Sequence, residues 1–285
     1  MNWLLLVIVS AVSFSVASLL QRVLLKEEQS DPIAYGAVFQ LLVSILIFFY
    51  ALIDGFSVPS NILSVLPNLI LMTLFYAWFN LTLFKAYQVS EASEVGIILA
   101  SRTMWSVVTA YFFLGEALPL NRIVGILLVI LGVIVVSWKK GSWKFNKGHV
   151  FAMLAAFFFG AAFTNDAFLI DHFGDVPSYM VISFALPSLA LLIMKPSSIK
   201  NLKMFMDIKR LGKMLVTSFL WGVAALTIFL AYQAGGDVIQ IQPISQISII
   251  ATVILAYFFL KEKKKIWQKI GGAFVVFGGV LLLIL

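Results

Sequence analysis

Two pairs of matching segments decide the fold, and the first pair is residues 81–88 (LTLFKAYQ) and residues 226–233 (LTIFLAYQ). The second pair is residues 110–116 (AYFFLGE) and residues 256–262 (AYFFLKE), where the spacing changes from 145 to 146 residues. Two apolar segments often agree by chance, but agreement that includes Thr, Gln and Glu in order is much rarer. We therefore predict that the chain contains an internal duplication.

The composition places this duplication in a membrane. Hydrophobic residues make up 62% of the chain and charged residues 12%, whereas a soluble domain has about 25% charged residues. A bilayer accommodates such a chain because positions that face lipid prefer apolar side chains. The first apolar segment lacks a basic start and a cleavage pattern, so we expect a retained span rather than a signal peptide.

Ten apolar segments approach the length of about 20 residues that a transmembrane helix needs. They are residues 3–21, 33–53, 66–84, 93–114, 119–137, 148–170, 177–194, 212–232, 239–260 and 267–285. The duplicated unit thus has five spans, and the units are residues 1–140 and 148–285. Because five is odd, the second unit enters the membrane from the opposite side. We predict an all-α membrane protein of ten transmembrane helices in two inverted five-helix repeats, an arrangement typical of secondary transporters.

The basic residues predict the orientation. All but two of the 20 Lys and Arg residues follow odd-numbered spans, and basic residues of short loops stay in the cytoplasm. The exceptions are Arg102, inside the fourth span, and Arg122, near the opposite face. We expect a multi-pass protein of the cell membrane with both termini outside, and we attribute the net charge of +7 to this orientation rather than to nucleic-acid binding.

The repeated segment resembles a known family. Five-span units that end in Ala-Tyr-Phe-Phe-Leu-x-Glu, followed by helices with glycines every seven residues, are similar to the EamA-type transporters of the drug/metabolite transporter superfamily. The resemblance covers both halves and implies ten helices around a central cavity, with export of metabolites such as amino acids. Thr103 and Ile249 stand where the family often has proline.

The glycines of that pattern are Gly125 and Gly132 in the first half, and Gly271 and Gly278 in the second. They recur on one helix face and permit close helix approach. We interpret them as packing positions.

Several function classes lack support in the sequence. No phosphate-binding loop of the Gly-x-x-x-x-Gly-Lys-Ser/Thr type occurs, and no ATPase subunit, enzyme activity or cofactor is implied. Without cysteine, thiolate metal sites are excluded, and His149 and His172 are too few and too separated for a metal site. We predict a secondary transporter, by expectation an exporter of small organic metabolites, that works by alternating access. Amino acids are the first candidate substrates.

Two ionisable residues inside spans are the best candidates for the site, because burying a charge in hydrocarbon is costly. Arg102 is suited to a carboxylate or phosphate of the substrate, and Asp166 to an amine or a coupling proton. A structural ion pair for Arg102 and a solvated helix end for Asp166 are the alternatives. Gln21 occupies the repeat position of Asp166, so we consider both as gate residues.

Aromatic and amide side chains form a second group of candidates for substrate binding, because a cavity lined by them suits flat or amphipathic solutes. Packing and lipid contact are the alternative roles for these residues. The group consists of Tyr76, Asn80, Trp105, Asn165, Trp221, Gln242 and Gln246.

Three other functions stay open. A nucleotide-sugar or phosphometabolite exchanger prefers several cations in the cavity, and only Arg102 is well placed. A lipid-carrier translocase needs a lateral opening between helices. A membrane scaffold that does not transport has a filled centre.

Overall fold

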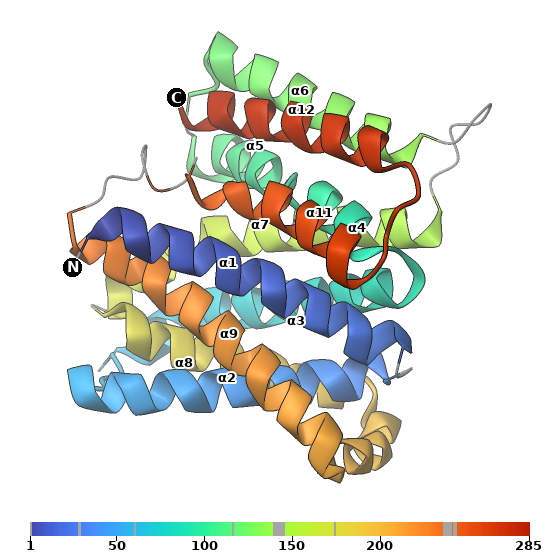
Figure 1. The fold of residues 1–285 in the computed structure, drawn as a ribbon. Helices are drawn as coiled ribbons and strands as arrows, with labels where there is room; N and C mark the ends of the chain where they lie inside the picture. Colours follow the sequence, from blue (N-terminus) through green and yellow to red (C-terminus); the bar gives the residue numbers. More distant parts are fainter. Residues whose placement is uncertain are drawn as a thin grey trace.

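The computed structural model describes residues 2–27, 30–59, 61–115, 117–138, 146–173, 175–235, 241 and 244–285. Within these residues the fold is a bundle of helices without strands (Figure 1). The α-helices are α1 (Trp3–Arg22), α2 (Pro32–Asp54), α3 (Leu66–Val89), α4 (Ala92–Leu99), α5 (Arg102–Leu114), α6 (Leu120–Ser137), α7 (Lys147–Phe173), α8 (Val176–Met194), α9 (Ile208–Gln233), α11 (Ile247–Phe259) and α12 (Ile266–Ile284). A π-helix, η1 (Val23–Glu27), and two 3-10 helices, η2 (Ile62–Val65) and η3 (Pro196–Met206), complete the set.

The described helices agree with the expected spans at most positions. Nine of the described helical segments are long and apolar enough to cross a membrane, and α11 is a shorter apolar helix. The α11 helix falls within the ninth expected span, residues 239–260, whose residues 239, 240, 242 and 243 lie outside the described part. The chain is therefore an all-α, multi-pass membrane protein.

The fourth span differs from the expected continuous helix because it is interrupted at Ala100 and Ser101. The Ser101 hydroxyl donates a hydrogen bond to the Ile98 carbonyl at 2.7 Å. Such a local bond gives the backbone an alternative to the regular helical pattern. The span consequently consists of α4 and α5, and Arg102 is the first residue of α5.

The contacts between helices have the symmetry of an inverted repeat. In the repeat, α7 is the counterpart of α1, and α9 is the counterpart of α3. The contact between α1 and α9 therefore corresponds to a contact between α7 and α3, and the structure contains both. Likewise α1 on α11 corresponds to α7 on α5, and α2 on α9 corresponds to α8 on α3. The pairs α2–α8 and α6–α12 map onto themselves. This pattern agrees with a pseudo-two-fold axis between the halves.

Small residues bring α6 and α12 together at one edge of the bundle (Figure 1). A Cβ atom at Gly125 would lie 2.8 Å from the carbonyl oxygen of Gly279, and one at Gly132 would lie 3.0 Å from that of Gly272. Backbones this close exclude any larger residue, so these four glycines allow the close approach.

The prediction for the second half of this pattern was wrong by one residue. Gly271 and Gly278 meet nothing within 4 Å, because the helix turns their neighbours Gly272 and Gly279 toward α6. The sequence has two adjacent glycines at each place, and the repeat spacing of 146 residues points to Gly271 and Gly278, so only the structure identifies the pair that packs.

Both termini lie at one end of the bundle (Figure 1). The other end begins where α1 meets η1 and includes η3 with its lysines. We call this second end the basic end, and we call the end with the termini the opposite end. The basic stretch of residues 195–211 between α8 and α9 contains the eleven-residue helix η3.

Candidate functional site

Arg102 stands where the interrupted fourth span is in close contact with α7. A Cβ atom at Gly160 of α7 would lie 2.7 Å from the carbonyl oxygen of Arg102 and 2.7 Å from the backbone nitrogen of Ser106. The absence of a side chain at Gly160 therefore lets α7 pack directly on the first turn of α5. This contact fixes the backbone from which the Arg102 side chain extends.

The Arg102 guanidinium lies between two aromatic rings. Its central carbon is 4.7 Å from the centre of the Phe159 ring and 5.3 Å from the centre of the Phe14 ring. Phe14 and Phe159 are equivalent residues of the two repeats, 145 positions apart. Cation–π attraction to two rings holds the charge in place.

No hydrogen bond or ion pair joins Arg102 to any residue of the described part of the chain. A guanidinium has five N–H donors, and cations within transmembrane segments are almost always paired. The arrangement can therefore accept an anion of planar geometry, such as a carboxylate, at the place where the two halves meet.

Tyr76 and Trp221 extend the aromatic surface symmetrically. The Tyr76 ring packs on Phe159, with 6.0 Å between ring centres, and the equivalent Trp221 packs on Phe14 at 4.9 Å. The structure thus brings Arg102, Tyr76 and Trp221 together around the two phenylalanines. These residues form the candidate site, which we call the aromatic cage.

Asp166 lies beside this cage but is held by other groups. The Tyr179 hydroxyl donates to one carboxylate oxygen of Asp166 at 2.5 Å, and the Tyr76 hydroxyl donates to the other. The neighbouring Asn165 exchanges two hydrogen bonds with Asn68 of α3. Both carboxylate oxygens of Asp166 therefore have donors, and within the described residues no hydrogen bond or ion pair joins Asp166 to Arg102.

The other candidates lie in different surroundings. Trp105 packs its ring on Phe157 at 5.2 Å, and the buried Asn80 amide donates to the Tyr76 carbonyl at 2.6 Å. Gln21 is fully buried at the end of α1, and Gln246 is buried directly before α11. Gln242 lies outside the described residues.

Three residues that complete the cage and the Asp166 cluster were not among the sequence-based candidates: Phe14, Phe159 and Tyr179. A signal for the phenylalanines was present, because they match at the same spacing of 145 as the quoted repeat. With 26 phenylalanines in the chain, one matched pair of that type does not stand out without the structure.

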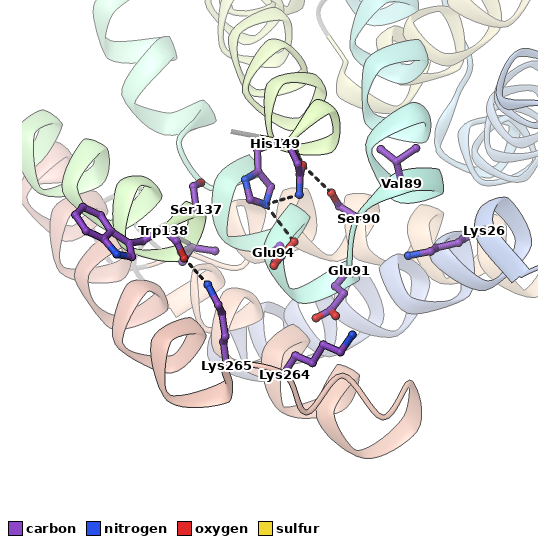
Figure 2. A pocket seen from close by; sticks show the side chains of 12 residues that line it. Lys26, Val89, Ser90, Glu91, Glu94, Ser137, Trp138, His149, Lys264 and Lys265 are labelled. Atoms are coloured by element: carbon purple, nitrogen blue, oxygen red, sulfur yellow. Dashed lines mark hydrogen bonds and ion pairs between the residues drawn. The ribbon is translucent and has the colours of Figure 1, made fainter. Parts of the chain in front are cut away.

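A pocket of about 460 Å³ lies at the basic end (Figure 2). Its charged members include Lys26, Lys264 and Lys265, together with Glu91 and Glu94. The Lys265 ammonium donates to the Trp138 carbonyl at 2.5 Å. The His149 ring nitrogen Nε2 lies 3.1 Å from the Glu94 carboxylate.

The glutamate of the second repeat motif holds the same end of the molecule together. The Glu262 carboxylate accepts hydrogen bonds from the backbone nitrogens of Ala92 at 2.8 Å and Ser93 at 3.1 Å. A carboxylate at this place accepts hydrogen bonds from the free N–H groups at the start of α4, and its negative charge interacts favourably with the positive end of the helix dipole. The ammonium of Lys269 pairs with Glu91 and lies 3.8 Å from Glu262. The role of this motif is therefore structural, and its first-half counterpart, Glu116, lies outside the described residues.

Comparison with known proteins agrees with this architecture. The model of the EamA-like transporter family matches residues 1–138 and residues 146–285. The comparison with curated proteins gave no match. A solved structure titled only "Crystal structure of protein" is similar in fold, with a TM-score of 0.52, 16% sequence identity and coverage of 94% of this chain and 95% of that one.

The two family matches together span nearly the whole chain, and each contains one copy of the five-span unit. The family consists of membrane transporters of the drug/metabolite transporter superfamily rather than of enzymes. Its fold agrees with the ten apolar segments and with the symmetric contacts between the halves. The chain belongs to the EamA-like transporter family.

Proposed function

We propose that this transporter is a secondary carrier that exports small organic metabolites bearing a carboxylate, with amino acids as the first candidates. Residues 1–140 and 148–285 act as the two units that rock against each other during alternating access. Arg102 binds the substrate carboxylate, and the aromatic cage contacts the remainder of the solute. The observation that carries this proposal is the Arg102 guanidinium, which lies between Phe14 and Phe159 without an acceptor in the described residues.

The remaining candidate residues have supporting roles in this proposal. Four of them shape and stabilise the helices around the cage: Trp105, Asn80, Asn165 and Gln246. Gln242 remains a candidate for substrate contact.

The proposed orientation follows from the basic end. Since Lys and Arg of short loops stay on the cytoplasmic side, the basic end faces the cytoplasm of the cell membrane and both termini lie outside. A substrate from the cytoplasm then enters past the pocket lined by Lys26, Lys264 and Lys265. Positive charge near the entrance raises the local concentration of anionic groups.

Counterflow in proteoliposomes tests the function. Vesicles containing the purified protein are loaded with one unlabelled amino acid, and uptake of the same labelled compound is measured, with its decarboxylated amine as a parallel probe. We expect uptake of the amino acid but not of the amine. A hydrogen-bonded charge pair contributes about 1.5–3 kcal/mol, so Arg102→Ala is expected to lower uptake by about tenfold or more.

Arg122→Ala is the matched control, because it removes an arginine near the opposite face, where the Arg122 side chain donates to the Ala117 carbonyl. It is expected to leave counterflow unchanged. Absence of counterflow for every amino acid tested, with protein that elutes as a single folded species, would remove amino acids as substrates. Equal uptake of acid and amine would instead refute the role of the carboxylate.

A further inference from the structure

Each half contains a similar corner near the start of its second helix. The sequence Asp-x-x-x-Tyr occurs at Asp31–Tyr35 on α2 and again at Asp175–Tyr179 on α8, 144 residues later. Both aspartates cap their helices: Asp31 accepts from the Ile33 nitrogen at 2.9 Å, and Asp175 accepts from the Ser178 nitrogen at 2.7 Å. The two tyrosines are therefore presented by equivalent backbones.

Each tyrosine faces an equivalent residue of the preceding membrane span. Tyr179 faces Asp166 of α7, and Tyr35 faces Gln21 of α1, where Gln21 and Asp166 are 145 residues apart. We call the pair Gln21–Tyr35 the basic-end corner and the pair Asp166–Tyr179 the opposite-end corner. The names follow from their positions near the two ends of the bundle.

The two corners differ in their hydrogen bonds. In the opposite-end corner, Asp166 accepts hydrogen bonds from Tyr179 and from Tyr76 of α3, so three helices are joined. In the basic-end corner, the Tyr35 hydroxyl and the Gln21 amide are close enough to interact electrostatically, but these buried polar atoms form no hydrogen bond of regular geometry. Gln21 and Tyr35 are each 0% exposed. Buried polar groups normally have partners, so an unsatisfied cluster of this kind requires an explanation.

Aromatic contacts connect both corners to Arg102. From the opposite-end corner, Tyr76 packs on Phe159, which lies under the guanidinium. From the basic-end corner, Tyr35 stacks on Phe39 at 5.9 Å, Phe39 packs on Trp221 at 5.7 Å, and Trp221 packs on Phe14. A solute at the guanidinium therefore contacts rings that lead to both ends of the molecule.

We propose that the two corners are alternating latches of the carrier, and that Asp166 is the proton-binding residue that controls the opposite-end latch. The structure has the opposite-end latch formed and the basic-end latch broken. In the other conformation Gln21 and Tyr35 bond to each other, and the bonds of Asp166 are lost. This inference rests on the proposed function by alternating access, but its test needs no substrate.

Protons act on the opposite-end corner alone because Gln21 does not titrate. A proton from the solution at the opposite end binds a carboxylate oxygen of Asp166 and neutralises it. Hydrogen bonds to a carboxylate are roughly twice as strong as bonds between neutral groups, so protonation weakens the latch.

The charged groups around Asp166 support its role as the titrating residue. The titratable side chains that face it are Tyr76 of α3 and Tyr179 of α8. Arg102 of α5 lies beyond the Phe159 ring, and Glu94 of α4 pairs with His149 at the other end of α7. No described cation pairs with Asp166 and competes with a proton there.

Cysteine accessibility tests the two latches, since the chain has no cysteine of its own. The reporters are Ile182→Cys and Val38→Cys, which are equivalent at the spacing of 144, partly buried, and located one turn after Tyr179 and Tyr35. Each is placed in nanodiscs, where both faces are reachable, and its labelling rate with a polar maleimide is measured. Labelling of a cysteine at an exposed position, Asn61→Cys, at the same pH corrects for the reactivity of the thiol.

We expect Tyr179→Phe to raise labelling at Ile182→Cys by at least about threefold, as the loss of one hydrogen bond allows, and to lower labelling at Val38→Cys. Tyr35→Phe, the matched control, is expected to leave labelling at Ile182→Cys the same or lower. Tyr76→Phe provides a second route to the same result if Tyr179→Phe does not fold. Unchanged labelling in folded Tyr179→Phe and Tyr76→Phe, or an equal rise at both reporters, would overturn the latches.

The proton is tested with the same reporter. Labelling at Ile182→Cys is expected to rise as the pH falls, and Asp166→Asn is expected to have high labelling at every pH. A pH dependence that persists in Asp166→Asn would overturn the role of Asp166. If labelling at Ile182→Cys changes as expected but counterflow fails, only the proposed substrate is refuted. If counterflow succeeds but labelling does not change as expected, the latches are refuted.

Discussion

Arg102 has no counterpart in the second repeat, because Ser248 stands at its equivalent position. The surrounding residues, by contrast, are matched: Phe14 with Phe159, and Tyr76 with Trp221. The Ser15 hydroxyl donates to the Ser248 carbonyl at 3.1 Å. This contact is the repeat equivalent of the close approach between Gly160 and the Arg102 backbone in the other half. The symmetric framework therefore carries one asymmetric charge.

Replacement of Arg102 by lysine separates charge from shape. Arg102→Lys keeps a positive charge but loses the planar fork that binds a carboxylate through two parallel bonds and stacks on aromatic rings. We expect the initial rate of amino-acid counterflow to fall by about tenfold at low substrate concentration. A rate equal to that of the unaltered protein would show that only charge matters at this position.

At the residue scale, the sequence predicts ionisable residues better than apolar ones. Arg102 and Asp166 stand out because charges are rare within spans. Phe14 and Phe159 do not, since an apolar ring in a membrane helix is ordinary until its neighbours are known. Tyr179, one of the two partners of Asp166, was missed because it lies on another helix, and contact between helices depends on packing that local spacing does not describe.

At the element scale, the lengths of the apolar segments and the polar residues between them predict the helices, but not the interruptions within a helix. At the break, the hydroxyl and the backbone nitrogen of Ser101 both donate to the Ile98 carbonyl. Serine occurs at many helical positions of this chain without breaking the helix, as at Ser15, which bonds to the Ala11 carbonyl within α1. Residue type alone therefore does not locate the break.

The contact between α6 and α12 gives a prediction with an internal control. A Cβ atom at Gly279 would lie 2.8 Å from the backbone nitrogen of Val129, whereas one at Gly278 would meet nothing within 4 Å. We expect Gly279→Ala to destabilise the protein by about 1–3 kcal/mol through overpacking. Gly278→Ala is expected to be neutral or to stabilise by up to about 1 kcal/mol.

Thermal unfolding in detergent, followed by helical circular dichroism, measures both glycine variants. Equal melting temperatures for the two alanine variants would contradict the assignment of Gly279 rather than Gly278 to the interface.

The start of α2 carries a charge whose effect depends on pH. Burial alone would raise the pKa of Asp31, but hydrogen bonds from the Ala34 nitrogen, the Asn201 amide and the Ile33 nitrogen, together with the Lys195 charge, lower it below the usual 3.8. A carboxyl whose pKa is lowered by folding stabilises the protein above the pKa of the unfolded chain, and this contribution disappears as the pH falls through the folded-state pKa.

Asp31→Asn keeps a capping side chain but removes the charge. We expect it to lower stability by about 1 kcal/mol near pH 7, the difference between charged and neutral hydrogen bonds. The difference in melting temperature from the unaltered protein is expected to shrink as the pH falls below about 3.8 and to vanish below the folded-state pKa of Asp31, where both side chains are neutral. A difference that is constant from pH 7 to pH 3 would mean that the charge of Asp31 has no role.

At the scale of the whole molecule, the repeat and the basic residues predict one topology. Leu285→Cys at the opposite end is expected to react with an impermeant maleimide in intact cells, and Lys203→Cys at the basic end only after permeabilisation. The reverse pattern would place the basic end outside and would invert the proposed direction of transport. Labelling of both sites in intact cells would contradict a single orientation.

The position of Arg102 between Phe14 and Phe159 also bears on how such a carrier is assembled. These two rings exchange places under the two-fold operation, so the guanidinium between them lies close to the axis itself. A homodimer of one five-helix unit would put two like charges there, whose repulsion at short range is strong, or it would have none. Joining unequal halves in one polypeptide allows a single charge on the axis, so each carrier molecule is suited to one anion at a time.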